Sequence, residues 1–294
     1  MGNAVLVVGD VMTDIIVAPE GPIVFGSDRR AKIRSHPGGS GANQAVWLAA
    51  QGAEVRFAAR IGAADQERWQ AHFTTRGIDA HLARDPDLPS GMLVTLLAAD
   101  GERSFLTDRG ANLALAIADL PDSLLDGVRL FLVSGYSLFA PGPRVAVLDL
   151  VARARLRNIA IAVDPASSGF LAECGADEFL GWIGGADIIL ANRDEARLLA
   201  GTDDLAAQVT ELGEHFARVV VKCGAEGAVI GDASGIAHSA SAQRVEAVDA
   251  TGAGDAFAAG FITAWLESAD PETALQRGIA AGAKAVTRLG GQPG

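Results

Sequence analysis

Cysteine is nearly absent from this chain of 294 residues. Only Cys174 and Cys223 are present, which excludes a disulfide framework and a zinc site built from CxxC pairs, and suits a reducing compartment. The N-terminal apolar run has no basic segment before it, and no apolar run approaches the ~18 residues of a membrane span. We therefore expect a soluble, cytoplasmic protein without a membrane partner.

Lysine is also scarce, and its placement excludes several classes of phosphate-binding protein. None of Lys32, Lys222 and Lys284 completes a GxxxxGK[ST] loop. The HRD and DFG motifs of protein kinases, the HExxH of zinc proteases and a GxGxxG after the first strand are missing too. The net charge of -12 argues against nucleic-acid or anionic-membrane partners, because both need a basic surface.

Short apolar runs alternate with helical patterns along most of the chain. Such alternation is typical of a mostly parallel sheet covered by helices on both faces, in one α/β domain spanning residues 1–294. The expected strands are residues 5–8, 55–59, 130–133, 159–163, 188–190, 219–221 and 228–230. The expected helices include residues 41–50, 66–76, 144–157, 193–200 and 205–215.

Two stretches near the front of the chain differ from this pattern. Residues 14–17 with 30–33, and 92–98 with 103–106, are half-polar and flanked by turns such as Ala99-Asp-Gly101. We expect them to form β-ribbons that stand off the main sheet as a lid, covering about residues 11–34 and 91–109. Such ribbons could pair edge to edge into a homodimer or simply face solvent.

The most informative run is Asp249-Ala-Thr-Gly-Ala-Gly-Asp255-Ala-Phe257. Gly252 and Gly254 permit a tight turn, and the apolar spacing after Asp255 predicts a helix, whose N-terminus would bind an anion through free backbone N–H groups. A carboxylate there is poorly suited to anion binding alone but well suited to accepting a proton from an attacking hydroxyl. The alternative is a carboxylate that only offsets the helix dipole.

A second glycine cluster, Pro37-Gly-Gly-Ser-Gly-Ala-Asn43, precedes another predicted helix. Its glycines would let the backbone approach a small polar ligand, and Asn43 has donors and an acceptor for two hydroxyl groups. The alternative is a glycine-rich turn with a capped helix start. The cluster narrowly misses the GxSxG of hydrolases, because Ala42 stands at the last position.

Together, the early Gly-Gly-x-Gly-Ala-Asn and the late Asp-x-Thr-Gly-Ala-Gly-Asp-Ala-Phe resemble the ribokinase-like, or PfkB, family of carbohydrate and nucleoside kinases. The order and spacing agree over essentially the whole chain. The resemblance implies a three-layer α/β/α sandwich with a small β-sheet lid. It also implies ATP-dependent phosphorylation of a primary hydroxyl on a sugar-like molecule, with Mg²⁺ as cofactor.

The resemblance assigns the late motif to catalysis. Asp255 matches the catalytic base, and Gly252, Ala253 and Gly254 match an anion hole that stabilises the transferring phosphoryl group. Thr251 would lie on the nucleotide side. Asp249 would help to bind a monovalent cation such as K⁺.

On the acceptor side, the aspartate matching Asp14 accepts hydrogen bonds from the acceptor's hydroxyls in similar kinases. Gly38, Gly39 and Asn43 would complete this side. Asp10 is a further candidate, or else a turn residue. Arg109 could meet an anionic acceptor group or the transferred phosphoryl, or could be an exposed lid-edge arginine. Met12 and Ser40 depart from ribokinases proper, where Asn and Lys often stand, so ribose itself is not the expected acceptor.

For the nucleotide, Asn192-Arg-Asp-Glu195 resembles the family's Asn-x-x-Glu motif, in which Glu organises a hydrated Mg²⁺ and Asn lies near the phosphates. The same residues could simply form a capping box. The segment Lys222-Cys-Gly224-Ala-Glu-Gly227 resembles the nucleotide loop. Two other readings stay open: a nucleoside kinase with the same machinery, and a catalytically idle protein that binds a sugar or nucleotide.

Overall fold

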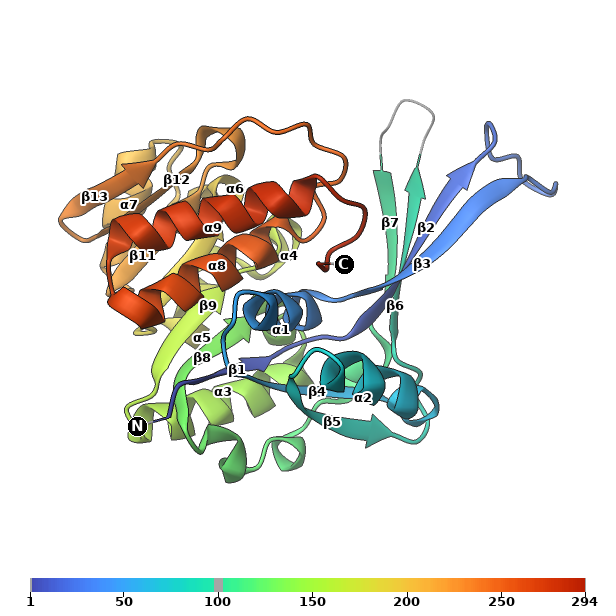
Figure 1. Ribbon diagram of the computed structural model, residues 1–294, viewed down its shortest axis with the longest axis horizontal. Coiled ribbons are helices and arrows are strands. Elements are labelled where there is room, and N and C mark those ends of the chain that lie inside the picture. The colour runs from blue at the N-terminus through green and yellow to red at the C-terminus, as the bar shows by residue number, and fades with distance from the viewer. Residues whose placement is uncertain (1, 98–102, 294) are drawn as a thin grey trace.

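A computed structural model of the chain describes residues 2–97 and 103–293. Its centre is a nine-stranded sheet with helices on both faces (Figure 1). In spatial order the strands are β13 (Gly235–Ala240), β12 (Ala228–Asp232), β11 (Arg218–Lys222), β10 (Ile188–Asn192), β9 (Ala160–Asp164), β8 (Val128–Ser134), β1 (Ala4–Val8), β4 (Val55–Gly62) and β5 (Asp79–Asp85). From β11 to β5 neighbouring strands pair in parallel, whereas β12 and β13 add an antiparallel edge.

Two apolar cores cover the two faces of this sheet. Strand β1 is buried along its whole length because its side chains alternate between the cores: Leu6 and Val8 enter one, Val5 and Val7 the other. The first core is closed by α3 (Pro141–Leu156), α4 (Ser168–Cys174), α5 (Ala176–Ile183), α6 (Arg193–Ala200) and α7 (Leu205–Gly213). The second is closed by α1 (Ser40–Ala50), α2 (Gln66–Thr74), α8 (Ala253–Ser268) and α9 (Pro271–Val286).

Short 3₁₀ helices complete the connections. They are η1 (Ala63–Asp65), η2 (Gly110–Ala114), η3 (Ile117–Asp119), η4 (Asp122–Leu125), η5 (Gly135–Leu138) and η6 (Gly224–Glu226). Among the described residues, no helix is long and apolar enough to cross a membrane.

A separate four-stranded sheet stands beside the sandwich (Figure 1). Its order is β3 (Ala31–Gly38), β2 (Met12–Pro19), β6 (Gly91–Leu97) and β7 (Arg103–Asp108). The two predicted ribbons therefore join, through parallel pairing of β2 with β6, into one sheet. Strand β3 continues to Gly38, beyond the predicted end at residue 33, and so leads directly into α1. The turn predicted at residues 99–101 lies outside the described residues.

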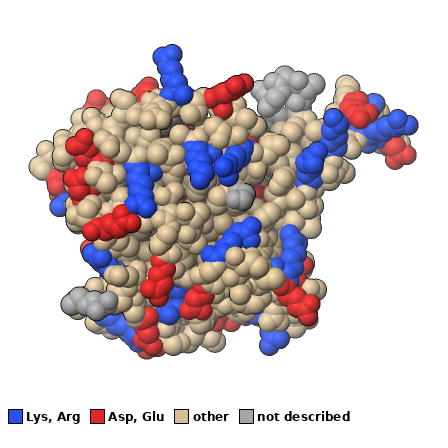
Figure 2. Space-filling model, viewed as in Figure 1, with Lys and Arg blue, Asp and Glu red and all other residues tan. Residues whose placement is uncertain are grey.

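The ends of β2 and β3, with the loop between them, form an arm that projects furthest from the body, and basic side chains lie along it (Figure 2). Arg29, Arg30 and Lys32 are exposed there, and so is Phe25 at the tip, whose relative exposure is 101%. Whether this edge pairs with a second copy of the chain remains a prediction.

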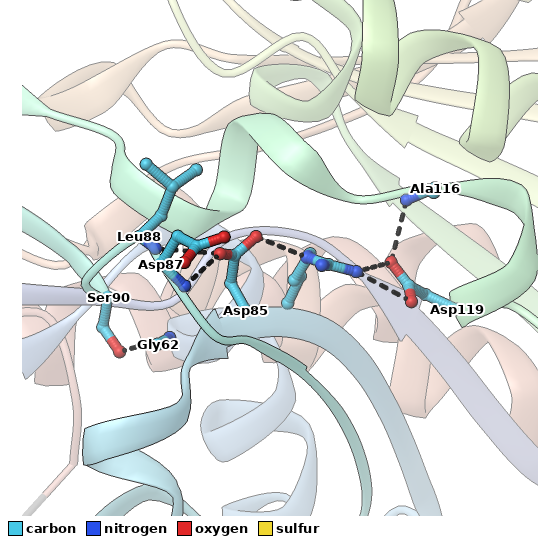
Figure 3. Close-up of polar contacts among 8 residues, drawn as sticks. Gly62, Asp85, Asp87, Leu88, Ser90, Ala116 and Asp119 are labelled. Carbon is cyan, nitrogen blue, oxygen red and sulfur yellow. Dashed lines mark hydrogen bonds and ion pairs between the residues drawn. The ribbon is translucent and has the colours of Figure 1, made fainter.

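A network of ion pairs and hydrogen bonds anchors the turn before β6, in the second sheet, to the main sheet. The Arg60 guanidinium donates hydrogen bonds to Asp85 and to both carboxylate oxygens of Asp119, at 2.9–3.0 Å. The other oxygen of Asp85 accepts the N–H groups of Asp87 and Leu88, which shape the turn into β6 (Figure 3). These backbone N–H groups, Leu88 first, hold the pKa of Asp85 below its usual range. The turn that starts the second sheet is therefore anchored on β4 and β5.

The predicted architecture is confirmed by this arrangement, but several elements went unpredicted. Strands β5 and β13, at the sheet's two edges, mix polar and apolar residues, so they lack the continuous apolar run that revealed the inner strands. Helix α3 begins at Pro141, three residues before its predicted start, because proline suits the first turn of a helix.

Candidate active site

Polar side chains from four parallel strands meet at one edge of the main sheet. Asp10 follows β1, while Asp164, Asn192 and Lys222 are the last residues of β9, β10 and β11. Ligands of open α/β sheets bind beyond the carboxyl ends of the strands, so this edge is where a site is expected. Helix α8 and the Gly39–α1 corner face the same edge from the second core.

The two glycine motifs, more than 200 residues apart, meet at Asp255. Asn43 Nδ2 donates to Asp255 Oδ2 at 3.1 Å, and Ser40 Oγ donates to Asp255 Oδ1 at 2.7 Å. Gly252 caps α8 with φ 75°, and a side chain there would collide with the backbone of Gly291. Only glycine fits this turn without strain.

Burial is the largest cause that raises the pKa of Asp255, to about 7. The negative charge of Asp164 raises it as well, whereas the hydrogen bonds from Ser40 and Asn43 and the charge of Lys222 lower it. A carboxyl group with a pKa near the operating pH is suited to general-base catalysis. The position at the start of α8 also keeps Asp255 partly exposed, so a ligand can reach it.

Lys222 lies between this turn and two buried acids. Its Nζ donates to Asp164 Oδ2 at 3.0 Å, and a methyl group on Gly254 would lie 3.4 Å from the same nitrogen. Desolvation lowers the pKa of Lys222, but the charges of Asp164 and Glu195 outweigh it and raise the pKa above its ordinary value. The lysine is therefore a fixed positive charge beside the Gly252–Gly254 amides.

Asn192 and Glu195 form a reciprocal capping box at the start of α6. Asn192 Oδ1 accepts the Glu195 N–H at 2.9 Å, while the carboxylate of Glu195 accepts the N–H and Nδ2 of Asn192 at 2.8 and 2.7 Å. Burial raises the pKa of Glu195 most, whereas Lys222 lowers it. The capping-box reading of the sequence is thus confirmed, and the motif's role toward a metal stays a prediction.

Asp14, on β2, lies at the junction of the two sheets and is buried. Its Oδ1 has no hydrogen-bond partner among the described residues. Burial raises its pKa to about 7, with further contributions from the charges of Asp10 and Asp249. The backbone of Gly38 passes directly against this carboxylate, because β2 and β3 pair in that register.

Two more buried polar atoms near Asp14 lack partners in the described part of the chain. They are Asn43 Oδ1 and the Nε2 of His36, which is the cross-strand neighbour of Asp14. Gly39 has φ 92°, and a side chain there would lie 2.6 Å from the carbonyl oxygen of Asp10. Unpaired hydrogen-bonding atoms are thus buried beside a glycine corner that is packed closely against the chain after β1.

Asp10 lies against this glycine corner and pairs with Arg109. Asp10 Oδ1 accepts the N–H of Gly41 at 3.1 Å, and its Oδ2 is 3.9 Å from Arg109 Nη2. The guanidinium carbon of Arg109 lies 5.2 Å from the centre of the Tyr136 ring, within the range of cation–π contacts. The Arg109 side chain is therefore largely buried rather than exposed, and its role toward a ligand stays a prediction.

The remaining predicted residues surround the same edge. Asp249 is buried, its two oxygens accepting the N–H groups of Thr251 and Gly290, both at 3.0 Å. Gly224 begins η6 and Gly227 follows it, with φ 58° and 109°. Among the described residues there is no group of three His, Cys, Asp or Glu side chains able to hold a metal directly.

A family model named pfkB family carbohydrate kinase matches residues 3–294. The chain belongs to this family. A ribokinase of Haemophilus influenzae is 31% identical to this kinase, over 87% of this chain and 82% of its own. An aminoimidazole riboside kinase of Salmonella typhimurium is also 31% identical, over 98% of this chain and 90% of its own.

A solved structure from Escherichia coli, described as a candidate ribokinase II in complex with ATP and Mg²⁺, has the same fold as this kinase. Its TM-score is 0.86 at 24% identity, and the match covers 99% of this chain and 94% of that one. The family resemblance read from the two glycine motifs is therefore confirmed.

Sequence reasoning missed several residues of the site. Ser40 was noted only as a departure from ribokinases, yet it donates to Asp255. Asp164 lies outside every motif, and its only signal was its position at the end of a predicted strand. Trp47 carried no signal in the motifs, yet its Nε1 donates to the Gly291 carbonyl at 2.9 Å, which ties α1 to the segment behind Gly252.

Proposed function

We propose that this kinase transfers the γ-phosphoryl group of ATP to a hydroxyl, most simply a primary one, of a sugar or sugar-like small molecule. The observation that supports this most is the meeting of Asp255 with Ser40 and Asn43, since it places a base between the anion-binding turn and the acceptor-side asparagine. Asp255 accepts the hydroxyl proton as that oxygen attacks phosphorus and the bond to the leaving phosphate breaks.

The amides of Gly252, Ala253 and Gly254 act on the phosphoryl group. They lie at the N-terminus of α8, where the helix dipole stabilises negative charge, and the Ala253 N–H already donates to the Ala250 carbonyl at 3.2 Å. Lys222 adds a positive charge beside them, and Thr251, Gly224 and Gly227 flank the nucleotide. The same amides are worth most in the transition state, when charge on the transferring oxygens is redistributed.

The donor set fits a hydrated Mg²⁺ better than a directly bound one. Both oxygens of Glu195 already accept hydrogen bonds from Asn192, yet each keeps a free lone pair for a metal-bound water. When bound, the ion neutralises charge on the ATP phosphates. We further propose Asp249 for a monovalent cation, which a comparison of turnover in potassium and tetramethylammonium salts would test.

On the acceptor side, Asp14, Asn43 and the Gly38–Gly39 backbone bind the hydroxyl groups of the substrate. Asp14 Oδ1 and Asn43 Oδ1 can each accept a hydrogen bond without breaking one within the protein. The second sheet (β2, β3, β6 and β7), where the lid was predicted at about residues 11–34 and 91–109, closes over the acceptor within one domain and excludes water, which limits hydrolysis of ATP.

The decisive test is Asp255→Asn. We expect bound ATP to remain but turnover to fall by roughly a hundredfold or more, the range for acid–base groups. Asp28→Asn, an exposed aspartate on the arm, is the matched control and should turn over normally. Near-normal turnover in Asp255→Asn would contradict the assignment of the base.

A nucleoside acceptor is the second candidate, because one relative of 31% identity is named a riboside kinase. ADP release is measured with adenosine and aminoimidazole riboside and compared with ADP release with ribose and fructose. This comparison distinguishes a nucleoside kinase from a sugar kinase. Absence of ADP release with every acceptor, together with intact nucleotide binding, would favour a catalytically idle binding protein.

A further inference from the structure

Arg109, which lies beside the acceptor side of the site, is already engaged by another side chain. Arg109 Nη2 is 3.9 Å from Asp10 Oδ2, an ion pair rather than a hydrogen bond, and the guanidinium lies over the Tyr136 ring. Both charged side chains are largely buried, with 16% of the Arg109 side chain and 6% of the Asp10 side chain exposed. In such surroundings an ion pair is screened less than at the surface.

The pair is held by bonds on both sides. Asn112 Oδ1 accepts the N–H of Val11 at 2.9 Å, and its Nδ2 donates to the carbonyl groups of Val11 and Arg109 at 3.0 and 2.8 Å. Asn112 therefore ties the chain beside Asp10 to the turn that carries Arg109. Asp10 itself is fixed by the Gly41 N–H. These bonds fix the backbone on both sides of the pair and the Asp10 carboxylate, while the Arg109 side chain contacts Asp10 and the Tyr136 ring.

The other groups facing the acceptor are mostly hydrogen-bond acceptors. Asp14 and Asp255 are carboxyl groups, and Asn43 presents an unpaired carbonyl oxygen. His36 is the remaining basic side chain on this side, with its Nε2 unpaired among the described residues. A sugar hydroxyl can donate to these oxygens, whereas a carboxylate on the acceptor has no proton to donate and meets like charge.

Resting on the function proposed above, we propose that Asp10 selects the acceptor class. By engaging Arg109, it withdraws the arginine that could otherwise bind an acid group. The site then takes neutral polyhydroxylated acceptors and discriminates against sugar acids. Asp10 is a specificity-determining residue in this scheme, and Arg109 becomes available to a carboxylate only when Asp10 loses its charge.

The experiment compares each neutral acceptor with the acid formed by oxidation of its C1. D-ribose with D-ribonate, and D-fructose with 2-keto-D-gluconate, are matched pairs with a free primary hydroxyl. For the wild-type enzyme we expect kcat/KM for the acid to be at least about tenfold below that for the neutral partner, a discrimination typical of one unfavourable charge contact. Asp10→Asn should narrow this ratio by about tenfold, and adding Arg109→Gln should restore it.

Asp108→Asn is the matched control, because this exposed aspartate precedes Arg109 but bonds to the Gly110 N–H. It should leave the acid-to-neutral ratio unchanged. The proposal is overturned if the wild-type enzyme accepts the acids as well as their neutral partners, or if Asp10→Asn leaves the ratio unchanged.

Absence of turnover with every acceptor would instead contradict the proposed kinase reaction. In that event the preference for neutral over acidic ligands is measured by binding. The measurement is the rise in unfolding temperature that ribose and ribonate each produce in the wild-type protein and in Asp10→Asn. Equal shifts for both ligands in the wild-type protein would likewise overturn the proposal.

Discussion

The phosphoryl half and the acceptor half of the site differ in how completely their polar groups are paired. In the phosphoryl half, Lys222 bonds Asp164, and Asn192 and Glu195 bond each other in both directions. In the acceptor half, Asp14 Oδ1, Asn43 Oδ1 and His36 Nε2 are buried without partners among the described residues. Unpaired buried groups are costly, so a ligand that pairs them gains affinity from the contacts.

This difference separates two tasks. A paired network keeps its geometry before the ligand arrives, as stabilisation of a transferring phosphoryl group requires. The unpaired oxygens of the acceptor half instead favour a ligand whose hydroxyl groups lie where they can donate hydrogen bonds to these oxygens. Under the proposed function, this preference determines which substrate is phosphorylated. Asp255 touches both halves, because its hydrogen-bond donors, Ser40 and Asn43, belong to the acceptor side.

The largest loss of kcat is expected from a substitution that changes the backbone of the phosphoryl half. Gly252→Ala adds a methyl group 2.6 Å from Gly291 Cα at a residue with φ 75°. We expect kcat to fall by roughly a hundredfold, as when one preorganised oxyanion donor is lost. Steady-state assays of ADP release measure this.

Gly201→Ala is the matched control for Gly252→Ala. Gly201 ends α6 with φ 70°, and a methyl group there meets nothing within 4 Å. It should cost about 1–2 kcal/mol of unfolding free energy from the left-handed backbone alone and leave kcat unchanged. Equal loss of kcat in the two variants would mean that backbone strain, and not the geometry of the turn, explains the effect.

A smaller effect is expected from Asp164→Asn, which removes the charge that positions Lys222. The lysine would keep a hydrogen-bond partner but lose its ion pair, and we expect kcat/KM for ATP to fall by about tenfold. Lys222→Met alone and combined with Asp164→Asn completes a double-mutant cycle. Additive losses would show that the two residues act independently, contrary to this interpretation.

The fold and the site were predictable from sequence to different degrees. Continuous apolar runs revealed the inner strands, and Gly252 and Asp255 revealed the turn, because a local pattern specifies each of them. Asp164 could not be assigned, since its partner Lys222 is 58 residues away and only the register of β9, β10 and β11 brings them together. The Asp10–Arg109 ion pair could not be assigned for the same reason. The sequence suggested that each residue lies near the site, but not that their side chains form an ion pair.

The pH profile tests the pKa of Asp255. Because burial raises that pKa to about 7 and the base acts deprotonated, kcat/KM should rise with pH below about 7 and level off above it. Asp14 also has a pKa raised to about 7, so the acidic limb should be steeper than for one group. A limb centred near pH 4 would show that neither carboxyl group is perturbed in the working enzyme.

Ser40→Ala should give the smallest effect, and it tests the link between the two halves. The Ser40 hydroxyl donates to Asp255 and so favours the charged form, lowering its pKa. Removing it should move the acidic limb upward by up to about one pH unit, since a hydrogen bond to a charged group is worth about 1.5–3 kcal/mol, less where solvent reaches the pair. At pH 7 the variant would be several-fold slower, and at pH 9 close to wild type. A uniform loss at all pH values would mean that Ser40 positions the acceptor rather than tuning the base.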